Sequence, residues 1–392
     1  MKFRSGRHFL QLPGPTNVPG RILRAMEPPP IDHRGPEFGE LGKRILEGLK
    51  LVFGASGHVF VYPASGTGAW EAALVNTLSP GDRVVRYDNG HFSEGWGGVA
   101  ASMGLGVDVL PWDWRRPVDP AALEEHLDGD GDHEIKAVLL THNETSTGVM
   151  SDIQGIRAAI DRAGHPALFM VDAVSSLCTM ELLHDEWGID VTMSGSQKGL
   201  MLPPGLSFAA VSRKALDAHQ NARLPRSYWD WSAILASNES GYFPYTPATN
   251  LLYGLDEALK MLNEEGLENT LERHARLANA TRAAVAAWGL ENFCLEESGF
   301  SSAQTTVKMP EGSDADALRK IVLERFDMSL GSGLGKLKGQ IFRIGHMGDI
   351  NDLMVAGTLC GVEMGLELAG VPYRPGGVRA GLEVLCIEGG EA

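Results

Sequence analysis

Short apolar runs alternate with helix-like segments between about residues 58 and 212, and this alternation limits the chain to few folds. Strands that alternate with helices form parallel sheets, because each helix carries the chain back to the edge where the next strand begins. We therefore expect an α/β fold with helices on both faces of a mostly parallel sheet. The runs that we assign to strands are GHVFVYPAS, DRVVRYDNG, GVDVLPWD, KAVLLTHNE, ALFMVDAVSS, DVTMSGSQK and LSFAAVSR.

The rest of the chain indicates a second, smaller domain. A length of 392 residues exceeds that of an ordinary single core. A helical pattern broken at Gly266 leads out of the alternating region, and shorter strand-like and helix-like segments follow. We expect an N-terminal arm over residues 1–20, a large domain over 21–268 and a small α+β domain over 269–392, with the Gly/Pro-rich stretch after Gly370 loosely ordered.

Charge and cysteine usage argue against several classes of partner and site. A formal net charge of −16 repels nucleic acid and anionic membranes, and no apolar run reaches the about 18 residues that a membrane span needs. The first twenty residues have no apolar core, so we expect no signal peptide. The cysteines are few and isolated, which favours a cytoplasmic protein. The histidines lack metal-binding spacing, so we expect no metal site.

Polar residues follow several of the predicted strands at the point where each strand ends: Ser65, Asn89, Thr145, Asp172 and Lys198. In sheets of this kind, ligands bind beyond the carboxyl ends of the strands. Asp172 and Lys198 are 26 residues apart, a distance that fits one crossover between neighbouring parallel strands. We therefore expect an acid and a lysine to face the same ligand.

Lys198 stands among small, hydroxylated and apolar residues in VTMSGSQKGLMLPPG, a stretch without any acidic residue. Burial without a partner disfavours an ammonium ion and lowers its pKa, so that a neutral amine becomes accessible near neutral pH. Such an amine suits a covalent bond to an aldehyde. Pyridoxal phosphate needs a lysine for its aldehyde, a carboxylate for its pyridine nitrogen and a cradle for its phosphate, and Lys198 and Asp172 would provide the first two.

The stretch PASGTGAWEAAL supplies a candidate phosphate cradle. Ser65, Gly66 and Thr67 follow a predicted strand and open a helix, whose N-terminal amide groups favour an anion. Glu71 stands where a dinucleotide-binding GxGxxG motif requires its third glycine, so that motif is absent. Taken singly, this segment could be a helix cap, the acid a turn residue and the lysine a surface residue, but their order and spacing favour a site.

Seven segments form an ordered set of motifs: LPGPTNVP, SGTGAWEAAL, THNETSTGV, VDAVSS, SGSQKGL, PYTPATNLLYGL and FRIGHMG. Together they resemble the class V aminotransferases of fold type I, which are pyridoxal-phosphate enzymes. The motifs are most like those of serine–glyoxylate, alanine–glyoxylate and bacterial aspartate–glyoxylate aminotransferases. The resemblance covers nearly the whole chain and rests on the set rather than on any single member.

The resemblance implies roles for residues around the cofactor. Lys198 would form the Schiff base and carry a proton between the substrate Cα and the cofactor, and Asp172 would pair with the pyridine nitrogen. Gln197 and Thr145 would hydrogen-bond near the ring hydroxyl, with Thr145 also near the substrate. Phe92 occupies the position where many relatives have a tryptophan stacked on the ring, and a core role for this aromatic is an equal alternative.

The resemblance also implies roles in substrate binding and assembly. Arg343 would bind the substrate α-carboxylate with its planar fork. The active site of the family lies at a dimer interface, which implies a homodimer in which Thr246, and with it Tyr245, reaches the partner's cofactor phosphate. His33 and Arg34 in DHRGPEF would lie near the substrate mouth across the dimer and favour a donor with a second carboxylate. A turn that enters a helix is the alternative for this segment.

We therefore expect an aminotransferase that passes the amino group of aspartate or serine to glyoxylate in ping-pong order, giving glycine and a 2-oxo acid. A cysteine desulfurase-like lyase on the same scaffold is a rival, but residues 326–348 contain no cysteine for the mobile loop of such an enzyme. A non-catalytic scaffold of the same fold is a second rival. Such a protein would be expected to have lost Lys198, Asp172 or Arg343, and all three are present.

Overall fold

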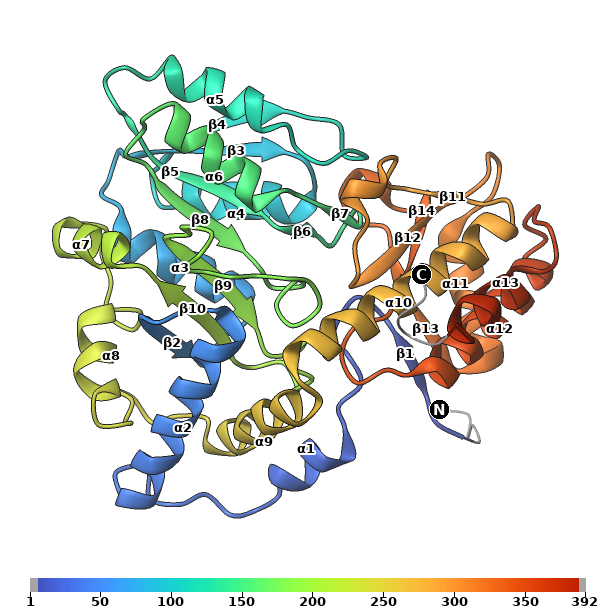
Figure 1. Ribbon diagram of the computed structural model, residues 1–392, viewed down its shortest axis with the longest axis horizontal. Helices are drawn as coiled ribbons and strands as arrows, with labels where there is room; N and C mark the ends of the chain where they lie inside the picture. Colours follow the sequence, from blue (N-terminus) through green and yellow to red (C-terminus); the bar gives the residue numbers. More distant parts are fainter. Residues whose placement is uncertain (1–5, 388–392) are drawn as a thin grey trace.

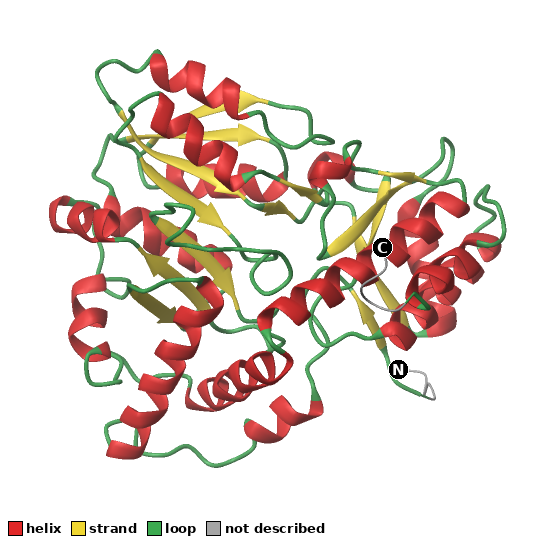
Figure 2. Cartoon of the chain, in the orientation of Figure 1, coloured by secondary structure: helices red, strands yellow, loops and turns green. Residues whose placement is uncertain are grey.

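The computed structural model describes residues 6–387, and two sheets form the centres of its two parts (Figures 1 and 2). The larger sheet has seven strands in the order β2-β10-β9-β8-β5-β3-β4. Only β10 runs against its neighbours, so the mostly parallel sheet is confirmed and all seven predicted runs are strands of it. The strands are β2 (His58–Tyr62), β3 (Arg83–Asp88), β4 (Gly106–Pro111), β5 (Ile135–Thr141), β8 (Leu168–Asp172), β9 (Val191–Gly195) and β10 (Ser207–Val211).

Helices cover both faces of this sheet, as the alternation predicted. Successive residues of a strand point to opposite faces, so Val138 and Leu140 of β5 join one apolar cluster while Ala137 and Leu139 join another. The first cluster includes α2 (Pro36–Phe53), α5 (Pro120–Asp128), α6 (Ile153–Arg162) and α9 (Thr249–Glu265), and the second includes α3 (Gly66–Thr77), α4 (His91–Ser102), α7 (Arg213–Asn221) and α8 (Trp231–Asn238).

Two connections at the centre of the sheet depart from the alternation. Residues 173–190, between β8 and β9, form turns rather than an α-helix. Residues 196–206, between β9 and β10, form a loop, because β10 runs back antiparallel to β9. Lys198 lies at the start of this loop, which places it beyond the carboxyl end of β9.

The smaller sheet has the order β1-β13-β14-β12-β11 and includes the N-terminal arm, because β1 pairs parallel with β13. Its other pairs are antiparallel. The elements of this part are β1 (Phe9–Gln11), α10 (Leu267–Ala287), β11 (Glu291–Asn292), β12 (Gln304–Lys308), α11 (Ala315–Phe326), β13 (Met328–Ser332), β14 (Ile341–Gly345), α12 (Asp352–Leu368) and α13 (Gly377–Leu385). A short helix α1 (Gly20–Ala25) and the two-stranded pair β6 (Asn143–Glu144) and β7 (Val149–Met150) complete the larger part.

The helical region breaks at Gly266, where φ is +84° and α9 gives way to α10, as the sequence predicted. The sequence predicts that the chain after Gly370 is loosely ordered, and this is wrong for residues 371–387, which include the helix α13. The carboxylate of Glu363 accepts hydrogen bonds from the Trp288 indole (2.6 Å) and from the Val378 amide (3.0 Å), which holds the start of α13 against α10 and α12. Within residues 6–387, no helix has the length and apolar character that a membrane crossing requires.

The N-terminal arm connects the two sheets after it leaves β1. The Thr16 amide donates to the carbonyl oxygen of Gln197 (3.1 Å), and the Thr16 hydroxyl donates to that of Lys198 (3.3 Å). Gly345 at the end of β14 lies so close to the arm that a Cβ there would overlap the Leu12 carbonyl group. The arm is therefore packed between β14 and the loop that holds Lys198.

We expect Gly345→Ala to lower the free energy of unfolding by about 1–3 kcal/mol, because the added methyl group must displace the backbone of the arm. Gly98→Ala is the matched control, since a Cβ at this exposed position of α4 meets no atom within 4 Å. The control should be neutral or stabilising by about 0.5–1 kcal/mol, because glycine weakens helix interiors. Urea unfolding of the two variants measures both effects, and equal stabilities would contradict the tight packing of the arm.

Candidate active site

The carboxyl ends of the central strands meet at one edge of the large sheet. Thr141 of β5 is in register with Asp172 of β8, and Asp172 is in register with Met193 of β9. Gly195, at the end of β9, is paired with Ser207 of β10. Because β8 and β9 are neighbouring parallel strands, the predicted crossover between Asp172 and Lys198 is confirmed, and both residues lie at this edge.

Asp172 is a buried carboxylate with a side chain held by two hydrogen bonds. Its Oδ2 accepts from the Trp70 indole N–H (3.1 Å), and its Oδ1 accepts from the Val174 amide (2.8 Å). Burial raises the pKa of Asp172 to about 7, and the negative charge of Glu144 acts in the same direction, while the positive charge of Lys198 opposes it. The group therefore changes its charge in the physiological pH range.

Lys198 is only 8% exposed and forms no ion pair within residues 6–387. Its Nζ donates to the carbonyl oxygen of Pro13 (2.5 Å), and the next residue of the arm, Gly14, has φ of +92° and no room for a side chain beside the lysine. The pKa of Lys198 is lowered to about 8, mainly by burial and in part by the positive charge of Arg343, while the negative charge of Asp172 opposes the shift. A neutral amine is thus accessible near physiological pH, as the sequence indicated.

The start of α3 is an open cradle of hydrogen-bond donors. Ser65 is the N-terminal cap residue, yet its side chain makes no capping bond. The amide groups of Gly66 and Thr67 have no acceptor among the described residues, since the first turn of a helix has no intrahelical partners for them. A Cβ at Gly66 would lie 2.6 Å from Val174 Cγ2, so only glycine fits between the cradle and the segment after Asp172.

Arg343 of β14 is a buried cation that reaches from the small sheet to the turn between β6 and β7. Its Nη1 donates to the Thr145 carbonyl oxygen (2.6 Å) and its Nε to the Ser332 carbonyl oxygen (2.8 Å). The guanidinium has no ion-pair partner within residues 6–387, and burial lowers its pKa to about 10. An unpaired buried guanidinium is a favourable site for a carboxylate ligand, because the ligand would supply the missing counter-charge.

Thr145 and Gln197 lie next to these groups. The Thr145 hydroxyl donates to the Ser175 hydroxyl (2.6 Å), which donates in turn to the Asn143 carbonyl oxygen (3.1 Å). The Oε1 atom of Gln197 is buried and has no hydrogen-bond partner within the described chain. A buried acceptor without a donor is costly, so this atom points to a ligand that the protein is built to bind.

Phe92 is half-buried at the start of α4, beside the residues that hold Asp172. Its ring packs edge-on against Trp70, with 6.5 Å between the ring centroids. Its backbone amide donates to the Glu144 carboxylate (3.2 Å). The ring therefore packs beside the residue that holds Asp172, and its role as a stacking platform stays a prediction.

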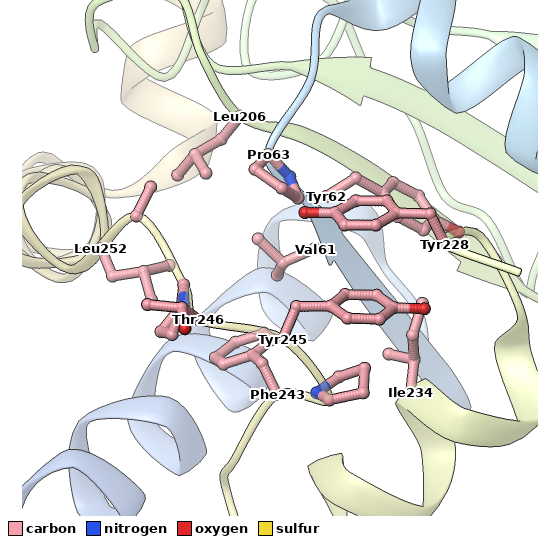
Figure 3. Close-up of a pocket in the computed structure, with 13 residues that line it drawn as sticks. Val61, Tyr62, Pro63, Leu206, Tyr228, Ile234, Phe243, Tyr245, Thr246 and Leu252 are labelled. Atoms are coloured by element: carbon pink, nitrogen blue, oxygen red, sulfur yellow. The ribbon is translucent and has the colours of Figure 1, made fainter. Parts of the chain in front are cut away.

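Thr246 and Tyr245 line a pocket whose lining does not include Lys198, Asp172 or Arg343. The mostly apolar groups around it also include Tyr62, Pro63 and Tyr228 (Figure 3). Tyr245 stacks on Tyr228 with 4.2 Å between the ring centroids, and its hydroxyl donates to the Ser227 carbonyl oxygen (2.7 Å). Thr246 is exposed and makes no hydrogen bond to the residues around Lys198 within the described chain.

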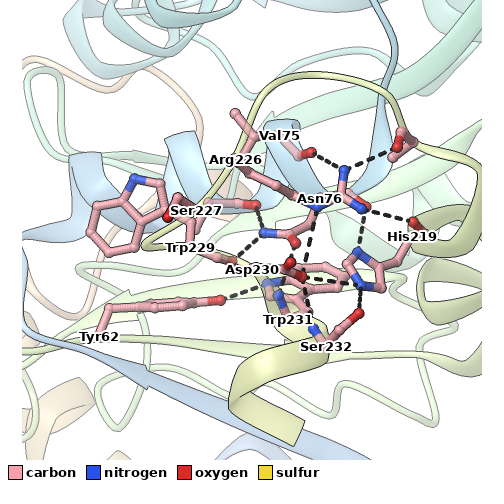
Figure 4. A network of polar contacts seen from close by, with 12 residues as sticks. Tyr62, Val75, Asn76, His219, Arg226, Ser227, Trp229, Asp230, Trp231 and Ser232 are labelled. Atoms are coloured by element: carbon pink, nitrogen blue, oxygen red, sulfur yellow. Dashed lines mark hydrogen bonds and ion pairs between the residues drawn. The ribbon is translucent and has the colours of Figure 1, made fainter. Parts of the chain in front are cut away.

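A polar network fixes the neighbouring segment over residues 226–232 (Figure 4). The Asn76 side chain donates to the Trp229 carbonyl oxygen (2.7 Å) and accepts from the Trp231 amide (3.0 Å), and the Trp231 indole donates to the Tyr62 hydroxyl (2.8 Å). The Trp229 indole donates to Glu71 of α3 (3.1 Å). The pocket of Thr246 is therefore attached to the helix that carries the cradle.

His33 and Arg34 lie in the turn before α2. The segment that joins α1 to α2 runs along the edge of the subunit, away from the ends of β8 and β9 (Figure 1). The turn is held by the Asp32 carboxylate, which accepts from the Arg34 amide (2.9 Å), and the exposed Arg34 side chain makes no bond within residues 6–387. A single chain therefore does not bring these two residues to the site.

Sequence reasoning missed two residues at the sheet edge, Trp70 and Glu144. Glu144 is fully buried, and its carboxylate accepts from the Ser93 amide (3.0 Å), the Ser146 amide (3.0 Å) and the Ser146 hydroxyl (2.6 Å). Burial raises its pKa, and these bonds oppose the shift. Both residues stand inside the quoted motifs, SGTGAWEAAL and THNETSTGV, but only the packing of α3 and α4 reveals what they contact.

The site thus combines a buried acid, a lysine with a lowered pKa, two helix amides that have no partner and an arginine that has no counter-charge among the described residues. These groups lie at the carboxyl edge of an α/β sheet and are typical of an enzyme that handles a small anionic carbonyl compound or amine. The sequence model of the family described as aminotransferase class-V matches residues 13–333. The chain belongs to this family.

Relatives with established names support the same assignment. The chain is 49% identical to serine–glyoxylate aminotransferase of Methylorubrum extorquens, with 96% of each chain covered. It is 44% identical to L-aspartate–glyoxylate aminotransferase of Paracoccus denitrificans, with 95% of this chain and 94% of the relative covered. The crystal structure of ureidoglycine–glyoxylate aminotransferase from Bacillus subtilis has a TM-score of 0.91 at 29% identity and covers 98% of this chain and 99% of that one.

We expect the amino group of Lys198 in the cofactor-free protein to titrate with a midpoint near pH 8. Arg343→Gln removes a positive charge that lowers this pKa, so the midpoint should rise; Asp172→Asn removes a negative charge that raises it, so the midpoint should fall. Reductive methylation with ¹³C-formaldehyde followed by NMR titration measures the midpoint, and Lys198→Ala identifies the signal. The same midpoint in all three proteins would contradict the shared site.

Proposed function

We propose that this protein is a pyridoxal-phosphate-dependent aminotransferase that moves the amino group of aspartate or serine to glyoxylate, giving glycine and a 2-oxo acid. The observation that carries the proposal is the meeting of Asp172, Lys198 and Arg343 at one sheet edge. The names of the relatives at 44–49% identity, which use serine or L-aspartate with glyoxylate, supply the substrates.

The residues present fit pyridoxal phosphate, the cofactor of class V aminotransferases. The amides of Gly66 and Thr67 and the Gln197 Oε1 atom have no partners among the described residues. The amides suit the cofactor phosphate, and the oxygen suits a hydroxyl donor on the cofactor ring. Ser65, Thr145 and Phe92 would complete the pocket, with Asp172 at the ring nitrogen and Lys198 at the aldehyde. When bound, this cofactor supplies an aldehyde that bonds to amines and a protonated ring that withdraws electrons from the substrate Cα.

The chain's own groups would then perform the acid–base and binding work. The neutral fraction of Lys198, favoured by burial, would take the Cα proton of the donor as a general base and return it as a general acid. Arg343 would bind the α-carboxylate through its fork and hold the Cα in reach of that amine. The same groups would serve donor and acceptor in turn, so the donor product must leave before glyoxylate binds, which is ping-pong order.

A homodimer with shared sites would explain the residues that one chain leaves away from Lys198. His33 and Arg34 lie at the subunit edge, and Thr246 and Tyr245 lie in the separate pocket of Figure 3. We propose that the partner subunit supplies them, Thr246 and Tyr245 to the phosphate and His33 and Arg34 to the substrate mouth.

The compartment and the domain bounds are part of the same proposal. Few and isolated cysteines support a cytoplasmic location, and the acidic charge supports small-molecule substrates rather than nucleic acid or membranes. The division into an arm over 1–20, a large domain over 21–268 and a small domain over 269–392 is supported by the change from α9 to α10 at Gly266. Residues 1–5 and 388–392 of that division lie outside the described residues.

A spectroscopic and kinetic test addresses the proposed function. We expect the purified protein to show visible absorbance from the bound cofactor and to form glycine from glyoxylate with aspartate or serine as donor. Lys198→Ala should lose the covalent adduct that borohydride traps in the parent protein and should lose more than about a hundredfold in kcat. A colourless protein that binds no added pyridoxal phosphate would refute the assignment.

The donor preference can be assigned with one variant. If the partner's Arg34 contacts the second carboxylate of aspartate, Arg34→Ala should lower kcat/KM for aspartate about tenfold or more while leaving serine nearly unchanged, since loss of a charged hydrogen bond costs about 1.5–3 kcal/mol. Arg379→Ala, at an exposed arginine on α13, is the control for the loss of a surface charge. An unchanged ratio of aspartate to serine removes Arg34 from donor selection.

A further inference from the structure

Trp70 of α3 contacts both Asp172 and Phe92 at the candidate site. Among the described residues, no other side chain of α3 makes a hydrogen bond or ring contact to both of them. The Trp70 indole N–H donates to Asp172 Oδ2 (3.1 Å), and its ring packs edge-on against Phe92. It stands one turn after Thr67, on the helix that opens with the cradle. One buried residue thus joins the cradle helix, the acid and the candidate platform.

The Asp172 carboxylate has few other donors. Within the described chain its side chain accepts only from Trp70 and from the Val174 amide (2.8 Å). The charged groups that face it from neighbouring elements are Glu144, which follows β5, and Lys198, which follows β9. A carboxylate that is 4% exposed needs its donors to stay ionised, so the indole N–H contributes directly to its charge state.

We propose that Trp70 is a positioning residue whose indole N–H keeps the Asp172 carboxylate ionised and oriented to receive the ring nitrogen of the cofactor. This inference rests on the proposed function, because the ring nitrogen belongs to pyridoxal phosphate. Trp70 acts through Asp172 and takes no part in proton transfer. A residue of α3 therefore contributes to the affinity of the protein for the cofactor and to the pH dependence of that affinity.

Trp96 of α4 offers a matched control. Its ring stacks on Trp70 with 6.0 Å between the centroids and an interplanar angle of 15°. Its indole Nε1 is buried but has no hydrogen-bond partner within the described chain. Trp96→Phe therefore removes the same N–H group from the same aromatic stack without removing a bond to Asp172.

The experiment measures the affinity of the cofactor-free protein for pyridoxal phosphate across the pH range in which Asp172 titrates. Loss of the indole donor disfavours the ionised carboxylate and raises the pKa of Asp172. On lowering the pH, a variant without this donor should therefore lose affinity for pyridoxal phosphate at a higher pH than the parent protein does. We expect Trp70→Phe to bind about tenfold more weakly at neutral pH, with its acidic limb about one pH unit higher. Trp96→Phe should stay within about twofold of the parent protein.

A double variant separates a direct structural effect from one that acts through the acid. In an Asp172→Asn background the indole has no carboxylate to support, so adding Trp70→Phe should change the affinity by less than about twofold. If Trp70→Phe does not fold, 3-benzothienylalanine introduced at position 70 keeps the size of the ring and replaces only the N–H by sulfur. The same residue at position 96 is its control.

The outcomes separate this inference from the function on which it rests. If the parent protein binds pyridoxal phosphate and the Trp70 and Trp96 variants share its affinity and acidic limb, the role of Trp70 is overturned. The proposed function is not affected by that result. An equal loss from Trp70→Phe with and without Asp172 also overturns it. A parent protein that does not bind the cofactor overturns the proposed function and this inference with it.

Discussion

The candidate site depends on the burial of two opposite charges at the carboxyl edge of the large sheet. Removing an ion from water costs several kcal/mol or more, so each buried group shifts its pKa toward neutrality. The pKa of Asp172 is raised to about 7 and that of Lys198 is lowered to about 8. Lys198 therefore has a proton that is easily exchanged near neutral pH, which is the property that acid–base catalysis requires, whereas Asp172 depends on its hydrogen-bond donors to stay ionised.

A second pair of buried charges connects this edge to the rest of the molecule. Arg343 comes from the small sheet and bonds to the Thr145 carbonyl oxygen, while the Glu144 carboxylate accepts from amides at the start of α4. Glu144 also acts on the pKa of Asp172 and of Arg343 through its charge. The site is thus assembled from both parts of the chain, and the N-terminal arm completes it through the bond from Lys198 to the Pro13 carbonyl oxygen.

Much of the fold could be predicted because strands that are buried on both faces read as continuous apolar runs, and all seven runs became strands. The segment after Gly370 could not be predicted, because its order comes from Trp288 and Glu363, which are distant in sequence. Thr246, His33 and Arg34 could be named from motifs, yet within one chain Thr246 lines a pocket that does not include Lys198, and His33 and Arg34 lie in the turn before α2. In the proposed homodimer, contacts between subunits would bring them to a site, and local patterns do not describe such contacts.

The sequence by itself determined the chemical groups of the site and the edge at which they meet, since strand ends and a 26-residue crossover place Asp172 and Lys198 without knowledge of packing. Only the tertiary structure decided which groups support them. Trp70, Glu144 and Pro13 act through hydrogen bonds between elements far apart along the chain, as in the 102 residues that separate Trp70 from Asp172. Such contacts depend on how helices pack on the sheet. Sequence periodicity predicts only which face of a helix is buried, and it does not predict the residues that this face contacts.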